Sequence, residues 1–254
     1  MIRTPKVKSD PSAQMPLLEH LRELRRRVIV SLIAVACVSA AAYIFFDPIV
    51  AFLFQPFRRV GALSARDEIL FVNSLFEGFV VRVRVSVLAG VVLSLPVHVY
   101  NIVRFILPGL RKRERRILMA SLAVSFCLVV ASFYYGYFKV IPISLQFLSS
   151  SGFIPARVGI LLNYGKNIFV IFQFLLVTVI VFQLPLVLEV LLIVKVLSLK
   201  GLLKASRYVT VGIFVLAAVV TPPDFVSQLA LALPLVALYF LTILVAKLFN
   251  FGRR

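Results

Sequence analysis

Cysteine and charged side chains are scarce in this sequence of 254 residues. Its two cysteines, Cys37 and Cys127, each lie inside an apolar run, which excludes a disulfide framework and a cysteine metal site. Charged residues make up 15% of the chain, whereas a globular domain has about a quarter. This composition excludes both a soluble enzyme and a disordered chain.

Motifs of catalysis and energy coupling are also missing. The sequence has no Walker A phosphate loop, no HExxH pair and no Ser-His-Asp arrangement. It has no repeated half with matched Gly/Pro-broken helices of the kind that indicates a secondary transporter. We therefore expect no cofactor and no enzymatic activity, and the chain is predicted to be a receptor or scaffold.

Hydrophobic residues, in contrast, make up 61% of the chain, and the mean hydropathy is +1.04. They form six blocks, most of them near the roughly twenty residues that cross a bilayer core. We predict an all-α integral membrane protein with a single membrane domain over residues 1–254. Its expected segments are a flexible basic tail (1–15), an amphipathic interfacial helix (16–27) and spans at about 28–46, 76–105, 117–140, 168–194, 208–220 and 225–246.

The fifth block, 208–220, is short, because thirteen residues make only about 20 Å of helix. The turn Thr221-Pro222-Pro223-Asp224 joins it to the sixth block. Pro222 and Pro223 stop one helix, and the carboxylate of Asp224 can cap the next. These two blocks are therefore expected to form a hairpin with both ends on one side of the membrane.

Lysine and arginine, which produce the formal net charge of +18, are distributed unevenly. Twenty of the 28 lie in the N-terminal stretch, the second-to-third and fourth-to-fifth connections and the C-terminal end; six lie in the other two connections. Positive charge favours the cytoplasmic side, so both termini are expected there, in a multi-pass protein of the cell (inner) membrane. The expected partner of this charge is the lipid bilayer, not nucleic acid.

A cleaved signal peptide is the alternative interpretation of the first block. Its basic flank and the small residues from Ser39 to Ala42 fit that pattern. Against it, the apolar run continues to Phe46, and the flank contains Glu19 and Glu23. We expect the first block to remain as a span.

Polar residues at membrane depth are costly and are candidates for function. Gln183 and Asn101 can form interhelical hydrogen bonds or contact a substrate. Glu189 can reach the interface or pair with Lys195. Together with His98, Gln183 and Glu189 suggest a rival function, a small-solute or ion transporter with an intramembrane polar path.

Two further carboxylates lie among cations near the expected cytoplasmic side. Glu23 is four residues before Arg27, a spacing typical of a local ion pair on a helix. Glu114 is surrounded by five cations between 111 and 116, and it can relieve the repulsion among them. From the charge pattern alone, both residues have these local explanations.

Five stretches nevertheless resemble the TatC family, the multi-spanning core of the twin-arginine protein translocase, in order and over nearly the whole chain. They are LEHLRELRRR from Leu18 to Arg27; Leu95-Pro96 followed by Tyr100; Phe105 through Pro108-Gly109-Leu110 to Glu114-Arg115; Phe182-Gln183-Leu184-Pro185; and Thr221 to Asp224 followed by Ser227-Gln228, Pro234 and Tyr239. The resemblance implies a concave bundle of six helices with short fifth and sixth helices.

The resemblance also implies binding of the twin-arginine signal peptides of folded precursor proteins. It implies partners too: small single-span proteins of the TatA/TatB type, other copies of the chain, and export driven by the proton-motive force. The arginine pair would contact Glu23 and Glu114, with Arg22, Arg25, Phe105, Pro108 and Leu110 as further residues of the site. Gln183 stands where some relatives carry a glutamate, which leaves a hydrogen-bonding role for it.

Overall fold

A computed structural model describes residues 17–59, 71–110, 112–149, 162–221 and 224–249, and these residues are helical almost throughout. Six stretches are long and apolar enough to cross a membrane: Leu18–Ile44, Leu75–Gly109, Lys112–Leu148, Tyr164–Ile193, Leu199–Val220 and Phe225–Leu248. The prediction of an all-α protein with six spans is thereby confirmed. The predicted tail (1–15) and the turn residues Pro222 and Pro223 lie outside the described residues.

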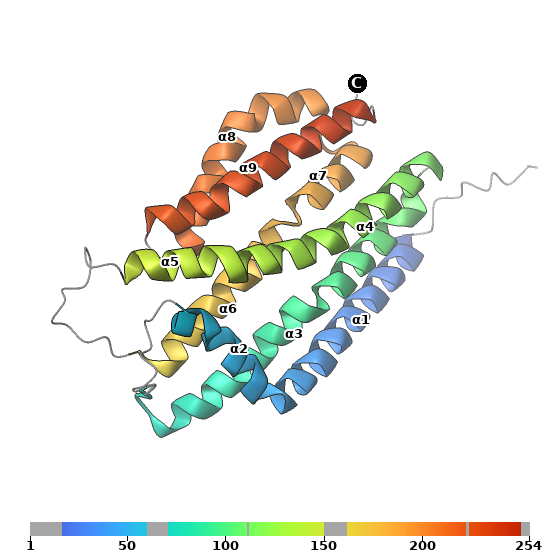
Figure 1. The fold of residues 1–254 in the computed structure, drawn as a ribbon. Coiled ribbons are helices and arrows are strands. Elements are labelled where there is room, and N and C mark those ends of the chain that lie inside the picture. Colours follow the sequence, from blue (N-terminus) through green and yellow to red (C-terminus); the bar gives the residue numbers. More distant parts are fainter. Residues whose placement is uncertain (1–16, 60–70, 111, 150–161, 222–223, 250–254) are drawn as a thin grey trace, which may run out of the picture.

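Nine α-helices form the described part of the bundle (Figure 1). They are α1 (Leu17–Ile44), α2 (Phe46–Arg59), α3 (Leu75–Ile106), α4 (Lys112–Tyr135), α5 (Ile141–Leu148), α6 (Tyr164–Val181), α7 (Leu184–Ile193), α8 (Leu199–Val220) and α9 (Phe225–Leu248). Figure 1 shows α1 and α3 side by side and antiparallel, with α8 and α9 as a hairpin on the other side of α4.

The pair α1 and α3 has the most extensive helix–helix contact among the described elements. A glycine explains how close the helices come, because a Cβ atom on Gly90 would lie 1.9 Å from the Oγ of Ser39. Small residues allow such close approach in membrane bundles. Farther along, the Asn101 amide donates to the Ser31 hydroxyl at 3.0 Å. Asn101 therefore makes an interhelical hydrogen bond.

The first span departs from the predicted segments at both ends. α1 is one continuous helix across the expected boundary at residue 27, because this stretch contains neither glycine nor proline. After a turn at Phe45, α2 follows, a helix that the hydropathy pattern did not predict. The Asp47-Pro48 pair marks its start, since an acid and a proline both suit the first turn of a helix.

Prolines account for irregularities in the third and fourth spans. A π-helical turn, Gly136–Val140, joins α4 to α5 just before Pro142, so the third span extends to Leu148. Residues 182 and 183 interrupt the fourth span between α6 and α7. Pro185, in the first turn of α7, has no N–H to donate, which favours a helix start there.

The fifth span is longer than its apolar block. α8 begins at Leu199, and the side chain of Ser198 caps it by accepting from the Gly201 N–H at 3.1 Å. The first turns carry Lys200, Lys204 and Arg207, so hydropathy alone finds only residues 208–220. With 22 and 24 residues, α8 and α9 form the shortest of the six spans, as the resemblance implied.

Asp224 begins α9 as its N-cap. Its buried carboxylate accepts the Ser227 backbone N–H at 2.6 Å, and the Ser227 hydroxyl also donates to it.

We expect Asp224→Ala to lower the free energy of unfolding by about 1–2 kcal/mol, because the first turn of α9 loses its cap. Thermal unfolding in detergent measures this loss. Asp224→Asn keeps an acceptor and should be milder; equal stability of the alanine variant would contradict the role.

Candidate functional site

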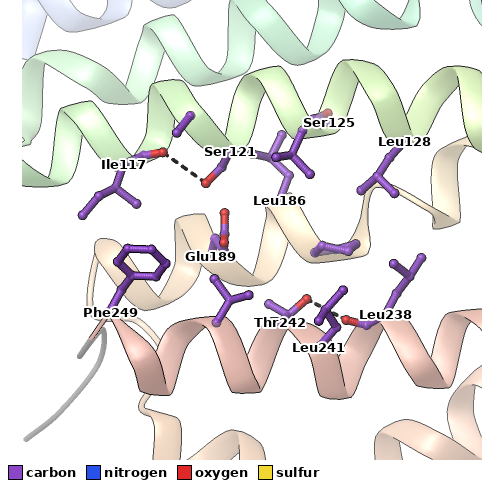
Figure 2. Close-up of a pocket in the computed structure, with 14 residues that line it drawn as sticks. Ile117, Ser121, Ser125, Leu128, Leu186, Glu189, Leu238, Leu241, Thr242 and Phe249 are labelled. Atoms are coloured by element: carbon purple, nitrogen blue, oxygen red, sulfur yellow. Dashed lines mark hydrogen bonds between the residues drawn. The ribbon is translucent and has the colours of Figure 1, made fainter.

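The polar residues predicted at membrane depth make separate contacts, some between helices and one within a helix. The Ser125 hydroxyl on α4 donates to the buried side-chain oxygen of Gln183, which therefore forms an interhelical hydrogen bond. His98 contacts Ser94 of its own helix at 2.9 Å. Figure 2 shows Glu189 pointing from α7 toward α4. Among the described residues, these contacts do not join into one polar path.

The predicted pair of Glu189 with Lys195 is not formed. Lys195 lies in the turn after α7 with a φ of 64°, and no ion pair joins it to Glu189 in the described chain. The side chain of Glu189 is 9% exposed and stays inside the bundle.

A second group of predicted residues gathers at one end of the bundle. The start of α1, the end of α3 and the start of α4 meet there, close to the end of α9 (Figure 1). This arrangement follows from the chain path, because α1 and α3 run antiparallel and a short turn reverses the chain into α4. The stretches that resemble a family signature, near 18–27 and 105–115, are therefore brought to the same end.

A ring contact fixes the start of α1 against α3. The rings of His20 and Phe105 are stacked, with centroids 4.2 Å apart and planes inclined by 20°. The residue before Phe105, Arg104, donates to the hydroxyl of Tyr100, one turn earlier on α3, at 2.9 Å. Phe105 thus acts as the surface on which the first turns of α1 rest.

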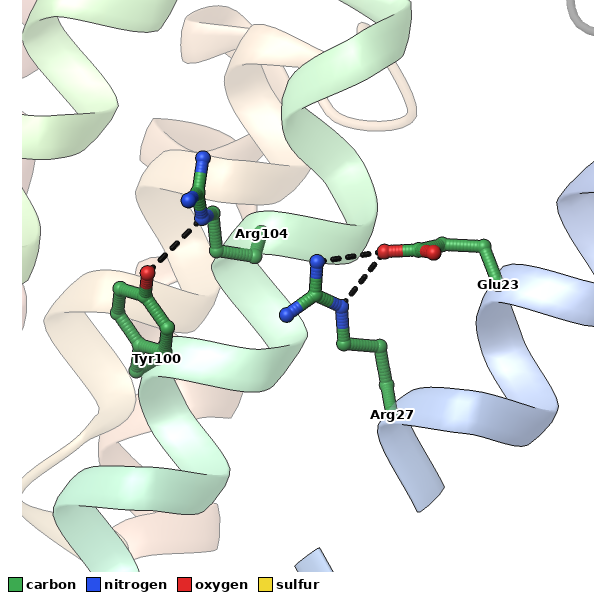
Figure 3. A network of polar contacts seen from close by, with 4 residues as sticks. All are labelled: Glu23, Arg27, Tyr100 and Arg104. Carbon is green, nitrogen blue, oxygen red and sulfur yellow. Dashed lines mark hydrogen bonds and ion pairs between the residues drawn. The ribbon is translucent and has the colours of Figure 1, made fainter. Parts of the chain in front are cut away.

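Glu23 is paired with an arginine of its own helix. The Arg27 guanidinium approaches one oxygen of the Glu23 carboxylate through two nitrogens, Nε at 2.7 Å and an Nη at 2.5 Å (Figure 3). Both side chains are 25% exposed, so the pair is accessible from outside the bundle. The spacing of four residues predicted this pair, and the structure confirms it. A carboxylate in this place can hold a guanidinium.

Glu114 differs from the cations around it. It lies in the first turn of α4 and is half-buried, whereas Lys112, Arg113, Arg115 and Arg116 are exposed. A carboxylate is favoured in this position by the partial positive charge of the helix N-terminus. The cations therefore project away from the bundle, and Glu114 is turned more toward it.

The turn between α3 and α4 gives this end its shape. Leu107–Gly109 forms a single 3-10 turn, closed by the Leu110 N–H donating to the Leu107 carbonyl at 3.2 Å. Leu107 is buried, Leu110 is half-buried and Pro108 is exposed. On α1, the predicted residues Arg22 and Arg25 are both exposed.

Loss of the His20 ring is expected to loosen the first turns of α1. An aromatic contact contributes about 0.5–1.5 kcal/mol, so amide hydrogen exchange of residues 18–24 should become about two- to tenfold faster in His20→Ala. His20→Phe keeps the stack and serves as the control. The same exchange rate in both variants and the wild type would show that the stack does not hold α1.

Known proteins resemble this chain over most of its length. The family model described as Sec-independent protein translocase protein (TatC) matches residues 19–234. The TatC of Carboxydothermus hydrogenoformans is 34% identical over 92% of this chain and 93% of its own length, and that of Aquifex aeolicus is 32% identical over 92% and 95%. A crystal structure of the twin-arginine translocase receptor TatC has a TM-score of 0.76 at 30% identity, covering 92% of this chain and all of that one. The chain belongs to the TatC family of Sec-independent protein translocases, which are transport proteins and not enzymes.

Proposed function

We propose that this protein binds the twin-arginine signal peptides of folded precursors at the end of the bundle where α1, α3 and α4 meet. Glu23 and Glu114 each bind one guanidinium of the arginine pair. Phe105, Pro108 and Leu110 shape the site beside them, while Arg22 and Arg25 flank Glu23 on α1. The observation that carries the proposal is the guanidinium already held by Glu23.

The chemistry of the arginine side chain suits two separate carboxylates. A guanidinium is planar and permanently charged, and it can donate two parallel hydrogen bonds to one carboxylate. Two guanidiniums that repel each other therefore need two acceptors on different elements. Glu23 on α1 and Glu114 on α4 meet this need at one end of the bundle.

Arg27 has to give way when a peptide arginine binds Glu23. An ion pair between residues four apart on a helix contributes only about 0.3–0.5 kcal/mol. A peptide arginine can donate in parallel to both oxygens of Glu23, whereas Arg27 contacts only one of them. Exchange of Arg27 for the peptide arginine is therefore favourable. Until then, Arg27 neutralises the carboxylate.

The cations around Glu114 do not oppose this function. A row of exposed Lys and Arg next to a span is attracted to the anionic lipids of the cytoplasmic leaflet. With these side chains at the lipid surface, the peptide meets Glu114 and not its neighbours. The same preference places both termini in the cytoplasm, in the cell (inner) membrane.

Export requires other components. The resemblance to the TatC family implies that the energy for export comes from the proton-motive force. Small single-span proteins of the TatA/TatB type and further copies of this chain assemble around the occupied receptor within the bilayer. The role of this chain is to recognise the precursor and to nucleate that complex.

Equilibrium binding tests the proposal. The full chain in lipid nanodiscs is titrated with a fluorescent twin-arginine signal peptide and with the same peptide carrying a lysine pair. Lysine cannot donate in parallel, so we expect the arginine peptide to bind at least about tenfold more tightly. Equal affinity for the two peptides would contradict the proposal.

A further inference from the structure

A narrow groove lies between α5, α6 and the last turn of α2, at the end of the bundle opposite the proposed twin-arginine site (Figure 1). Its volume is about 170 Å³. On α5 the lining extends from Ile141 to Leu148, and on α6 from Asn167 to Phe174, while Phe57 contributes from α2. Because both helices run along the groove, its length is about 10 Å, or two turns of helix.

The two polar side chains in the lining of the groove already have partners. The Ser144 hydroxyl donates to the Val140 carbonyl at 3.0 Å, and the Asn167 amide donates to the Asn163 carbonyl at 2.6 Å. The other lining residues are apolar. A hydrocarbon chain therefore fits this interior, whereas a peptide backbone would bring N–H and C=O groups that need partners of their own.

The groove opens toward lipid. Val170 belongs to its lining, and the side chain of Val170 is 48% exposed. The lining residues of α5 and α6 all lie in candidate membrane spans, where an exposed apolar side chain faces hydrocarbon. Spread over about 10 Å, the volume leaves a channel far narrower than the 10–12 Å diameter of a helix. A membrane helix cannot enter it, but a single hydrocarbon chain can.

A cation lies at the end of the groove near Asn167. Lys166 is exposed and stands four residues before Val170, so the two residues share one face of α6. As the third residue of α6, Lys166 lies near the end of the span, where its ammonium reaches the depth of lipid head groups. In the described chain no carboxylate forms an ion pair with Lys166. The carboxylate of Glu77 instead accepts the Gly165 backbone N–H at 3.2 Å.

We propose that this groove binds one acyl chain of an anionic phospholipid, in the leaflet farther from the twin-arginine site, and that the Lys166 ammonium binds the phosphate of that lipid. The order of groups along α6 matches the lipid: a cation at the depth of the head groups is followed by an apolar channel. Anionic head groups are attracted to such a cation. The proposal does not depend on twin-arginine binding, because the two sites lie at opposite ends of the bundle.

A protein segment, from this chain or from a partner, is the competing occupant. Such a segment would exclude lipid from the groove. Labelling of the groove by lipid probes would then be no stronger than labelling elsewhere on the surface, whichever head group the probe carries. The response to the head group therefore separates the two occupants.

The test uses the full chain in phosphatidylcholine liposomes that contain a trace of photoreactive lipid. Two probes carry the same photoreactive acyl chain, one with a phosphatidylglycerol and one with a phosphatidylcholine head group. Mass spectrometry measures the labelling of residues 141–148 and 167–174. It is divided by the labelling around Val130, which is 70% exposed and lies outside the groove. This ratio removes the general contact of the spans with lipid.

We expect the ratio to be about three- to fivefold higher for the phosphatidylglycerol probe, the effect of one lysine near an anionic head group. Lys166→Gln should abolish this preference. Lys139→Gln is the matched control and should keep it. Lys139 is also exposed, but neither it nor Ile143, one turn along the chain, lines the groove.

A second pair of variants tests the groove itself. Val170→Trp should fill its opening and lower the labelling of residues 141–148 by both probes. Phe169→Trp places the same ring on the neighbouring exposed surface, outside the lining, and should not. Equal ratios for the two probes, or a preference that survives in Lys166→Gln, would overturn the inference. If Val170→Trp fails to fold, the comparison of Lys166→Gln with Lys139→Gln still decides.

Discussion

Glu23→Gln and Glu114→Gln are each expected to weaken binding of a twin-arginine peptide about tenfold or more. Glutamine keeps the shape of the side chain but removes its charge, so the hydrogen bond with the guanidinium loses its charge assistance. Such a bond contributes about 1.5–3 kcal/mol, and 1.4 kcal/mol corresponds to a factor of ten. The side chain of Glu23 is 25% exposed, which favours the lower end of this range for that residue. Peptide titration in nanodiscs measures both effects.

Glu19 provides the matched control. It lies on the same helix as Glu23, in the first turn of α1, and it is exposed. Glu19→Gln removes the same charge but should leave affinity within about twofold, because a surface charge acts weakly through water. Equal losses in Glu19→Gln and Glu23→Gln would indicate a general attraction between charges and would contradict a specific site.

Gly90 substitutions are expected to have the largest effect on stability. Alanine at this position would place its Cβ 1.9 Å from the Ser39 Oγ and 3.0 Å from the Ser39 Cβ, in the contact between α1 and α3. Overpacking of this kind costs about 1–3 kcal/mol. We expect Gly90→Ala to lie near the lower end of that range and Gly90→Leu at or above its upper end. Thermal unfolding in detergent ranks the stabilities of the wild type and the two variants.

Ser39→Ala is the compensating change. The Ser39 hydroxyl is buried and has no hydrogen-bond partner in the described chain, so its loss alone should leave stability unchanged or slightly higher. In Gly90→Ala it removes the closest clash and should restore most of the lost stability, but not all, because the Cβ of residue 39 remains close. Absence of any rescue would mean that the helices do not meet at this point.

The sequence predicted the spans more accurately than the connections. Six apolar blocks were enough to place the spans, because the bilayer requires about twenty apolar residues for each of them. The helix α2 was missed because it follows the first span almost without a break, and its first residue, Phe46, was assigned to the end of that span. The start of α8 was missed because Lys200 and Lys204 lower the hydropathy without ending the helix.

For the candidate site, contacts within one helix could be predicted and contacts between helices could not. The four-residue spacing of Glu23 and Arg27 predicted their pair, as it does on any helix. The stack of His20 on Phe105 joins residues 85 positions apart, and no periodicity in the sequence relates them. The hydrogen bond from Ser125 to Gln183 could not be predicted either. The interruption between α6 and α7 determines which serine of α4 the Gln183 amide faces.

The most direct measurement is photo-crosslinking of a bound twin-arginine signal peptide to the full chain in nanodiscs. A photoreactive residue next to the arginine pair should label both the first turns of α1, near Glu23, and the first turn of α4, near Glu114. A lysine-pair peptide should label both more weakly. Labelling confined to one of these helices, or located at the opposite end of the bundle, would contradict the central claim that two carboxylates on α1 and α4 bind one arginine pair.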